Sequence, residues 1–283
     1  MISNNGEASL SDGGIEETDG GSKDRYDMTK NPHGIALYIH NACFQDGCVD
    51  GAETEDDGGG MAEQLRALKY QVVEMRDLTG EEITAVCEVL AGKCRVERLA
   101  VGMREQLVQK GLYNASVRVE ATDDSFLCCL VSHGALGKIY GVDGVALDVS
   151  QIAQCFGAKN CPWLSGKPKI FLIQASLQTA IGKTEAHMER ADVSALVDES
   201  DFLLSYSVYP GTPSYRVHDA LYLTHLRRAL KSSAKTHAEL HSILAEAHRL
   251  AQERVELLQQ KGVVECVKQC PLRVDTLRYK IYF

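Results

Sequence analysis

The chain has 283 residues, of which 45% are hydrophobic and 24% are charged, and its formal net charge is -9 at pH 7. This is the composition of an ordinary globular protein, so a chain that is disordered throughout is excluded. The acidic balance argues against a nucleic-acid partner and against a protein that docks on anionic lipid, because both need a basic surface.

Residues 1–32 contain seven acidic side chains, five glycines and few large apolar residues. Such a segment buries too little surface to offset the entropy of ordering, so we predict a disordered acidic leader. The first residues lack the basic and apolar regions of a signal peptide, and no apolar run approaches the ~20 residues of a membrane helix. We therefore expect a cytoplasmic protein without a membrane partner.

Short apolar runs follow, and most of them are continuous rather than alternating, which is typical of strands covered on both faces. They lie at 34–40, 70–77, 125–133, 168–176, 202–209 and 277–283. Stretches with helical period lie between them, at 61–68, 81–90, 149–156, 221–230 and 236–260, and Thr79 is the expected N-cap of the second. Strands that alternate with helices favour an α/β sheet with helices on both faces.

Two segments interrupt this alternation. Residues 51–60, GAETEDDGGG, are acidic and rich in glycine, so we expect a mobile loop. Residues 177–200 have no strand pattern and are expected to form a linker between a larger region, 33–176, and a smaller one, 201–283.

The ten cysteines do not form the two CxxC pairs of a typical zinc site. In a chain without a secretory signal, we interpret them as reduced thiols, most of which fill the core. No metal site and no cofactor are expected.

Two of the predicted strands end in polar residues that can carry chemistry. His133 and Gly134 follow one buried run, and Gln174 and Ser176 end another. Because sites in open α/β sheets form outside the carboxyl ends of strands, these two ends could meet in one crevice. A histidine beside a hydroxyl or thiol is the arrangement for nucleophilic attack, although an arbitrary histidine at a strand end is more often structural.

The segments FLCCLVSHGALGKIYGVDG (126–144) and GKPKIFLIQAS (166–176) closely resemble the caspases. The resemblance extends from about residue 32 to residue 283, and further matches lie at 68–83, 198–204 and 214–216. It implies a six-stranded, mostly parallel sheet with helices on both faces, a large-subunit region at 33–176, an intersubunit linker at 177–200 and a small-subunit region at 201–283.

The same resemblance assigns roles to individual residues. It implies that His133 is the base, that Gly134 is an oxyanion donor and that position 176 holds the nucleophile. Gln174, Tyr215 and Arg216 would bind substrate, and processing would follow Asp192 or Asp198 in the linker. For Gly134 the structural alternative is that the turn after the strand needs glycine.

Three departures from the family pattern argue against ordinary activity. Ser176 stands where the family has its nucleophilic cysteine, and it is followed by Leu177 and Gln178 rather than a polar residue and glycine. No arginine occurs between Met28 and Gln64, where the family has the first arginine that binds a P1 aspartate. Leu221 takes the position of the tryptophan of the family's G-S-W motif.

These departures favour a catalytically inactive caspase homologue that regulates apoptotic caspases by binding, as FLICE-like inhibitory proteins and other caspase decoys do. Ser176 is then a small polar residue in an inactive site rather than a weak nucleophile. Gln174 and Arg216 either still bind a carboxylate or pair with the acidic residues 53–57.

Two alternatives place the chain among the proteases. In the first it is an active cysteine endopeptidase of the caspase family, represented here with Ser in place of Cys at position 176. In the second it is a divergent protease that does not select aspartate. Only an active enzyme would have a peptide or protein substrate.

The run LRYKIYF at 277–283 is apolar and β-rich. The resemblance implies that this strand pairs with its mate across a two-fold axis. We therefore expect a homodimer, or a heterodimer with an active caspase, that forms through residues 277–283.

Overall fold

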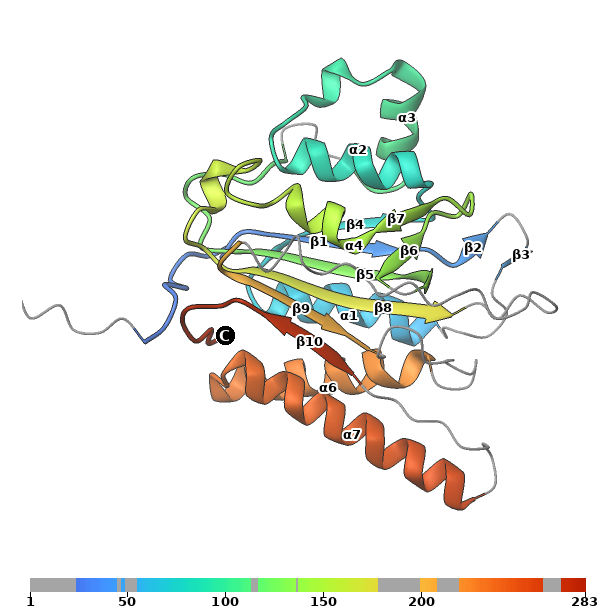
Figure 1. Cartoon of the computed structure of the whole chain (residues 1–283), viewed down its shortest axis with the longest axis vertical. Coiled ribbons are helices and arrows are strands. Elements are labelled where there is room, and N and C mark those ends of the chain that lie inside the picture. The colour runs from blue at the N-terminus through green and yellow to red at the C-terminus, as the bar shows by residue number, and fades with distance from the viewer. Residues whose placement is uncertain are drawn as a thin grey trace, which may run out of the picture.

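The computed structural model describes residues 24–44, 47–48, 55–112, 117–135, 137–177, 199–207, 219–261 and 271–283. A twisted sheet lies in the middle of the molecule, with α2, α3 and α4 on one side and α1, α6 and α7 on the other (Figure 1). This is the predicted α/β architecture with helices on both faces.

The main sheet has six strands along its path, in the order β10-β9-β8-β5-β1-β4. Neighbouring strands are parallel except at one edge, where β10 is antiparallel to β9. A small antiparallel extension, β6 and β7, is attached to β5, and β2 and β3 form a separate hairpin. The strands are β1 Ile35–His40, β2 Cys43–Phe44, β3 Gly47–Cys48, β4 Gln71–Arg76, β5 Phe126–Ala135, β6 Lys138–Tyr140, β7 Ala146–Asp148, β8 Lys169–Leu177, β9 Phe202–Tyr206 and β10 Leu272–Asp275.

The predicted helices are present, and α2 begins as its sequence indicates. Thr79 caps it by accepting a hydrogen bond from the Glu82 amide, while the Glu82 carboxylate accepts one from the Thr79 amide at 2.7 Å. The sequence analysis missed α3, in which only Leu107 is buried and an apolar stripe is absent. The helices are α1 Glu55–Ala67, α2 Gly80–Leu90, α3 Val101–Gln109, α4 Val149–Gln154, α6 Asp219–Thr236 and α7 Leu240–Gln260.

Each central strand contributes to two hydrophobic clusters, one on each face of the sheet. In β5, Cys128 and Leu130 join the cluster beneath α2 and α4, whereas Cys129 and Val131 join the one beneath α1, α6 and α7. Because successive side chains point to opposite faces, a strand covered on both faces has to be apolar at every position. This is why the apolar runs of the central strands are continuous.

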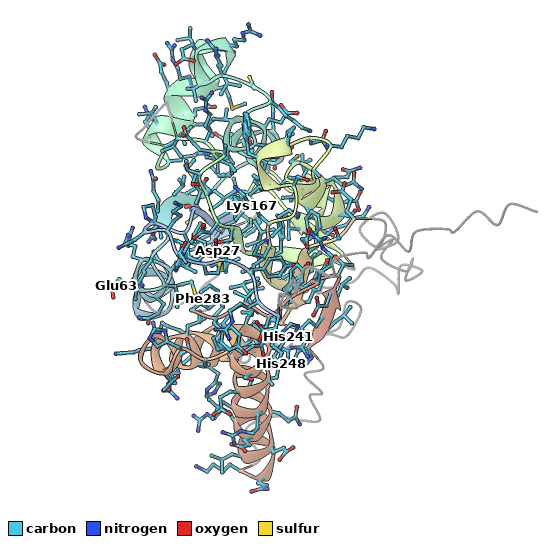
Figure 2. All side chains as sticks on the ribbon, turned by 90° about the vertical axis from the view of Figure 1, so that its left-hand side faces the viewer. Asp27, Glu63, Lys167, His241, His248 and Phe283 are labelled. Atoms are coloured by element: carbon cyan, nitrogen blue, oxygen red, sulfur yellow. The ribbon has the colours of Figure 1, made fainter. Side chains whose placement is uncertain are left out.

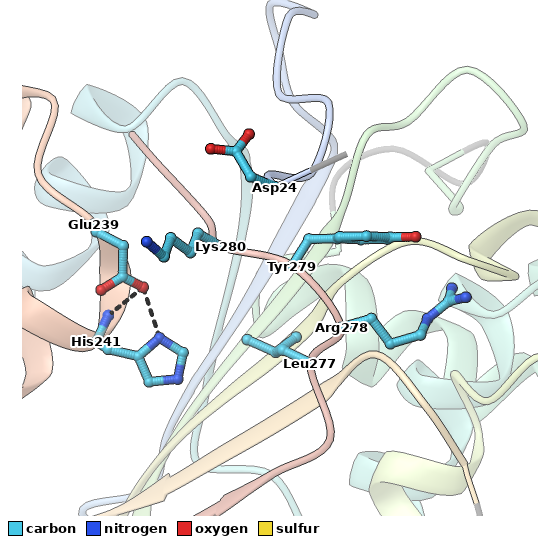
Figure 3. Close-up of a pocket in the computed structure, with 7 residues that line it drawn as sticks. All are labelled: Asp24, Glu239, His241, Leu277, Arg278, Tyr279 and Lys280. Atoms are coloured by element: carbon cyan, nitrogen blue, oxygen red, sulfur yellow. Dashed lines mark hydrogen bonds and ion pairs between the residues drawn. The ribbon is translucent and has the colours of Figure 1, made fainter. Parts of the chain in front are cut away.

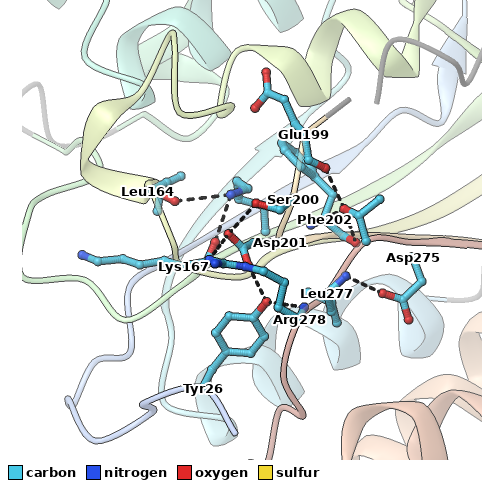
Figure 4. Close-up of polar contacts among 12 residues, drawn as sticks. Tyr26, Leu164, Lys167, Glu199, Ser200, Asp201, Phe202, Asp275, Leu277 and Arg278 are labelled. Carbon is cyan, nitrogen blue, oxygen red and sulfur yellow. Dashed lines mark hydrogen bonds and ion pairs between the residues drawn. The ribbon is translucent and has the colours of Figure 1, made fainter. Parts of the chain in front are cut away.

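The predicted leader boundary at residue 32 is wrong, because residues 24–32 belong to the fold. The Tyr26 ring is buried, and its hydroxyl donates a hydrogen bond to the Asp201 carboxylate at 2.6 Å (Figure 4). The composition of the segment does not reveal this buried residue, because a single aromatic side chain contributes little to a composition dominated by acidic residues and glycine. Residues 1–23 lie outside the described part of the chain.

The prediction of a strand at 277–283 is also wrong. The last strand, β10, ends at Asp275, and the residues after it make only isolated bridges, Arg25 with Lys280 and Glu239 with Tyr282. Ile281 is fully buried in the cluster with α7, and Phe283 lies toward α1, as Figure 2 shows. Ile281 is therefore covered within the chain, whereas Leu277, Tyr279, Tyr282 and Phe283 are half-buried.

Part of the predicted loop 51–60 is helical, because α1 begins at Glu55. Met61 and Leu65 anchor the helix in the core. Residues 51–54 are outside the described ranges.

Candidate functional site

His133 and Ser176 are register partners on neighbouring parallel strands. The Cα atoms of β5 and β8 pair from Phe126 with Lys169 up to Gly134 with Leu177, and His133 stands opposite Ser176. Adjacent strands lie about 4.8 Å apart, so the backbone brings the two positions together at the carboxyl ends of the strands. The expected meeting of these two strand ends is therefore present.

His133 is nearly buried, and an aromatic ring covers it. The ring of Phe44 lies 4.2 Å from the imidazole, centroid to centroid, with an angle of 36° between the two planes. Phe44 belongs to β2, so the small hairpin beside the main sheet reaches the end of β5. The sequence analysis missed Phe44, and the only signal for it was its position shortly after the end of the first strand.

Gly134 lies within β5 rather than in a turn. A Cβ atom at this position would stand 2.6 Å from the Cβ of Ala175 and 2.6 Å from the carbonyl oxygen of Lys138. Glycine is therefore needed because β8 and β6 approach closely. The turn after the strand contains Gly137, which has a φ of 68°. Close strand packing therefore explains the glycine at position 134, whereas the sequence analysis had expected a turn to require it.

Gln174 and Ser207 form a second pair of polar residues beside the first. Ser207 directly follows β9, and its amide donates a hydrogen bond to the carbonyl of Ile173 at 2.9 Å. Both side chains are almost completely buried, and within the described ranges neither the Gln174 amide nor the Ser207 hydroxyl has a hydrogen-bond partner. Unsatisfied groups of this kind can donate a hydrogen bond to, or accept one from, a polar group that enters the site.

The strand ends are held by a polar layer beneath the site. The Asn41 side chain donates to the carbonyls of Leu78 and Tyr140 and accepts a hydrogen bond from the Leu78 amide at 2.9 Å. The Ser132 hydroxyl donates to the Tyr140 carbonyl at 2.6 Å. These bonds join the segments after β1 and β4 to the end of β6, and they join β6 to β5, so hydrogen bonds fix the backbone from which His133 projects.

Four of the predicted functional residues lie outside the described residues: Tyr215, Arg216, Asp192 and Asp198. The described part of the chain has no group of three or more His, Cys, Asp or Glu residues that could hold a metal ion. Among its helices, none is long and apolar enough to cross a membrane.

A family model described as the caspase domain matches residues 102–282. The chain belongs to the caspase family. Caspase-8 of Mus musculus is 27% identical over 282 residues, which cover 91% of this chain and 52% of the relative. Caspase-3 of Mesocricetus auratus is 28% identical over 266 residues, which cover 91% of this chain and 86% of that protein. The chain thus spans about half the length of the caspase-8 relative and most of the caspase-3 relative.

Membership of the caspase family confirms the resemblance found in the sequence. The mostly parallel sheet with helices on both faces agrees with it. The matched range includes both β5 and β8, so the pair of His133 and Ser176 lies inside the caspase domain.

Proposed function

We propose that this caspase-family protein is catalytically inactive and regulates an active caspase by binding to it. The observation that carries the proposal is the register pair of His133 and Ser176, with a hydroxyl at the position of the family's nucleophilic thiol. A thiol with a pKa near ~8.5 is readily drawn to thiolate by a histidine, whereas an alkyl hydroxyl is not ionised at neutral pH. A site shaped for sulfur therefore loses most of its activity with serine.

The residues available for a P1 aspartate support the same proposal. No arginine occurs between Met28 and Gln64, and residues 53–57 contribute four carboxylates and one hydroxyl instead of a guanidinium. Gln174 brings a neutral amide to the site. A substrate carboxylate would lack half of the cationic fork that this family uses, and it would face acidic residues.

The edge of the sheet at β10 is the surface that we propose for binding. In the described part of the chain no strand pairs with the outer side of β10, whereas the opposite edge, β4, is flanked by another segment. There the Arg76 amide donates to the carbonyl of Lys110. An open edge offers backbone groups for an added strand. We therefore place the partner, a second copy or an active caspase, on β10 rather than on 277–283.

A peptidase assay tests the proposed lack of activity. The purified chain, free of other caspases, is incubated with a fluorogenic tetrapeptide that ends in aspartate. We expect no turnover above that of His133→Ala, and little with Ser176→Cys, because the carboxylate remains poorly bound. Vigorous turnover by Ser176→Cys that Ser176→Cys with His133→Ala lacks would instead support the active cysteine endopeptidase.

A second assay tests regulation. An active caspase is titrated with the chain while its kcat/KM on the same peptide is measured, and complexes are sought by sedimentation. We expect a saturable change in kcat/KM that follows complex formation. If the caspase neither binds the chain nor changes its rate over the whole titration, the regulatory proposal fails.

A further inference from the structure

Two cysteines stand opposite each other on the β2–β3 hairpin. Cys43 of β2 and Cys48 of β3 are antiparallel register partners, and two residues separate the strands in the sequence. Figure 1 shows this hairpin beyond the end of β1, outside the main sheet. Cys43 is exposed, whereas both cysteines of the central strand β5 are buried. The pair therefore differs from the cysteines that fill the core.

The hydrogen bonds of the Cys43 amide show which kind of antiparallel pair this is. In a hydrogen-bonded pair, the two residues exchange both of their backbone N–H···O bonds. The amide of Cys43 instead donates to the carboxylate of Asp77 at 2.9 Å, and the Ala42 amide donates to the same oxygen at 2.8 Å. The pair with Cys48 is therefore the non-hydrogen-bonded kind, in which the Cα atoms lie about 4.5 Å apart. A disulfide needs about 4.4–6.8 Å between its Cα atoms, so the backbone register allows one here.

The same hairpin contacts the candidate site. Successive residues of a strand point to opposite sides, so the Phe44 ring lies toward His133 while its neighbour Cys43 is exposed. Asp77, which directly follows β4, holds the β2 side of the hairpin. In the part of the chain that the structure describes, β3 pairs only with β2. A covalent bond from Cys43 to Cys48 would therefore join the two strands and hold Phe44 over the imidazole.

We propose that Cys43 and Cys48 form a redox switch, in which hydrogen peroxide joins them in a disulfide that fixes the hairpin, and with it Phe44, over His133. The exposed Cys43 thiolate attacks one peroxide oxygen, forms a sulfenic acid and releases hydroxide, which takes up a proton. The Cys48 thiolate then attacks the sulfenic sulfur, so that the S–S bond forms, the S–O bond breaks and a second water leaves. Two thiols lose two electrons, and one peroxide is reduced to two waters. Thiol reductants reverse the bond by exchange.

Peptide mapping tests whether the bond forms. The full chain is reduced, treated with hydrogen peroxide, denatured and alkylated. Trypsin then releases peptide 31–66, which contains Cys43, Cys48 and no other cysteine, and peptide 139–159, in which the half-buried Cys155 is the internal control. We expect peptide 31–66 to escape alkylation, with a mass about 2 Da below that of its dithiol form, while peptide 139–159 is alkylated.

The rate at which diethyl pyrocarbonate modifies His133 measures how firmly the hairpin is held. The imidazole is nearly buried and in contact with Phe44, so the reagent reaches it mainly when the hairpin moves away. We expect peroxide to slow this modification about threefold or more in the wild type and to leave the rate unchanged in Cys48→Ser. The exposed His237 is the internal control and should react equally fast before and after oxidation.

Two results would each overturn the inference. One is a peptide 31–66 that is alkylated as completely as peptide 139–159 after peroxide treatment. The other is a modification rate of His133 that does not change when the disulfide forms. Neither measurement uses a partner caspase or a peptidase substrate, so its outcome is independent of the proposed function.

Discussion

Phe44 and His133 are in ring contact although they come from different sheets of the molecule. Their centroids are 4.2 Å apart, and the contact covers one face of the imidazole at the end of β5. The histidine of the candidate site is therefore held by the β2 hairpin as well as by its own strand. Its environment depends on a residue that no catalytic motif identifies.

Replacing Phe44 by leucine should free the imidazole from this contact. Aromatic pairs are worth about 0.5–1.5 kcal/mol beyond their buried area, so we expect the free energy of unfolding to fall by about 1 kcal/mol. The ring-proton shifts of His133 in NMR spectra should also move, because the ring current of Phe44 is lost. Trp163→Leu, at an exposed tryptophan, is the control and should leave those shifts in place. Unchanged His133 shifts in Phe44→Leu would contradict the contact.

His241 should make the free energy of unfolding depend on pH above pH 6.5. Its ring bonds to Glu239 at 2.6 Å and contacts Asp275, in a pocket also lined by Asp24, Arg278 and Lys280 (Figure 3). Burial alone would lower the pKa of His241, but the two carboxylates outweigh it and raise that pKa above 6.5. The resulting stability is complete below pH 6.5 and is lost as the pH rises through the higher folded pKa.

Urea unfolding between pH 5.5 and 9 measures this dependence. His241→Gln should remove that part of the pH profile, and Glu239→Gln should lower the pKa of His241 in an NMR titration. Lys280→Gln, on the same pocket wall, is the control for a change of surface charge. Identical profiles for the wild type and His241→Gln would show that the histidine is not the titrating group.

Tyr26 should anchor the segment before β1. Its hydroxyl donates to Asp201, which also accepts two hydrogen bonds from Arg278, at 2.8 and 2.9 Å. Tyr26→Phe removes one partner of a buried carboxylate, so we expect a loss of about 1–3 kcal/mol in the free energy of unfolding. Tyr282→Phe is the matched control, and equal losses in the two variants would refute a specific role for Tyr26. Chemical denaturation provides the comparison.

An active caspase should cut the linker after Asp192 or Asp198, both of which lie outside the described residues. An acidic P1 residue in a segment without strand or helix pattern is accessible to a protease. Mass spectrometry of the digest locates the cut, and the double variant Asp192→Ala, Asp198→Ala should resist it. The two pieces should remain associated, because β8 and β9 pair from Lys169 with Phe202 to Ile173 with Tyr206. A linker that stays intact after long exposure would contradict this prediction.

The sequence by itself determined the order and type of most elements, and it named the two strand ends that could form the site. Strands covered on both faces need continuous apolar runs, so β1, β5, β8 and β9 are visible as such. The order of the caspase motifs pointed to His133 and Ser176 and indicated that the two strand ends could meet, and the structure then showed that they stand opposite each other in the register of β5 and β8. These features depend on local residue patterns and on the order of motifs, and both can be read from a single amino-acid sequence.

Only the tertiary structure decided which apolar segments are covered within the chain and which edge is left open. Residues 272–275 and 277–283 both alternate in polarity, yet the first is the edge strand β10 and the second buries Ile281 under α7. The same holds for Tyr26, whose partners Asp201 and Arg278 lie far away in sequence. Burial of this kind results from contacts between segments that are distant in sequence. The local periodicity of a segment does not show which distant segment packs against it.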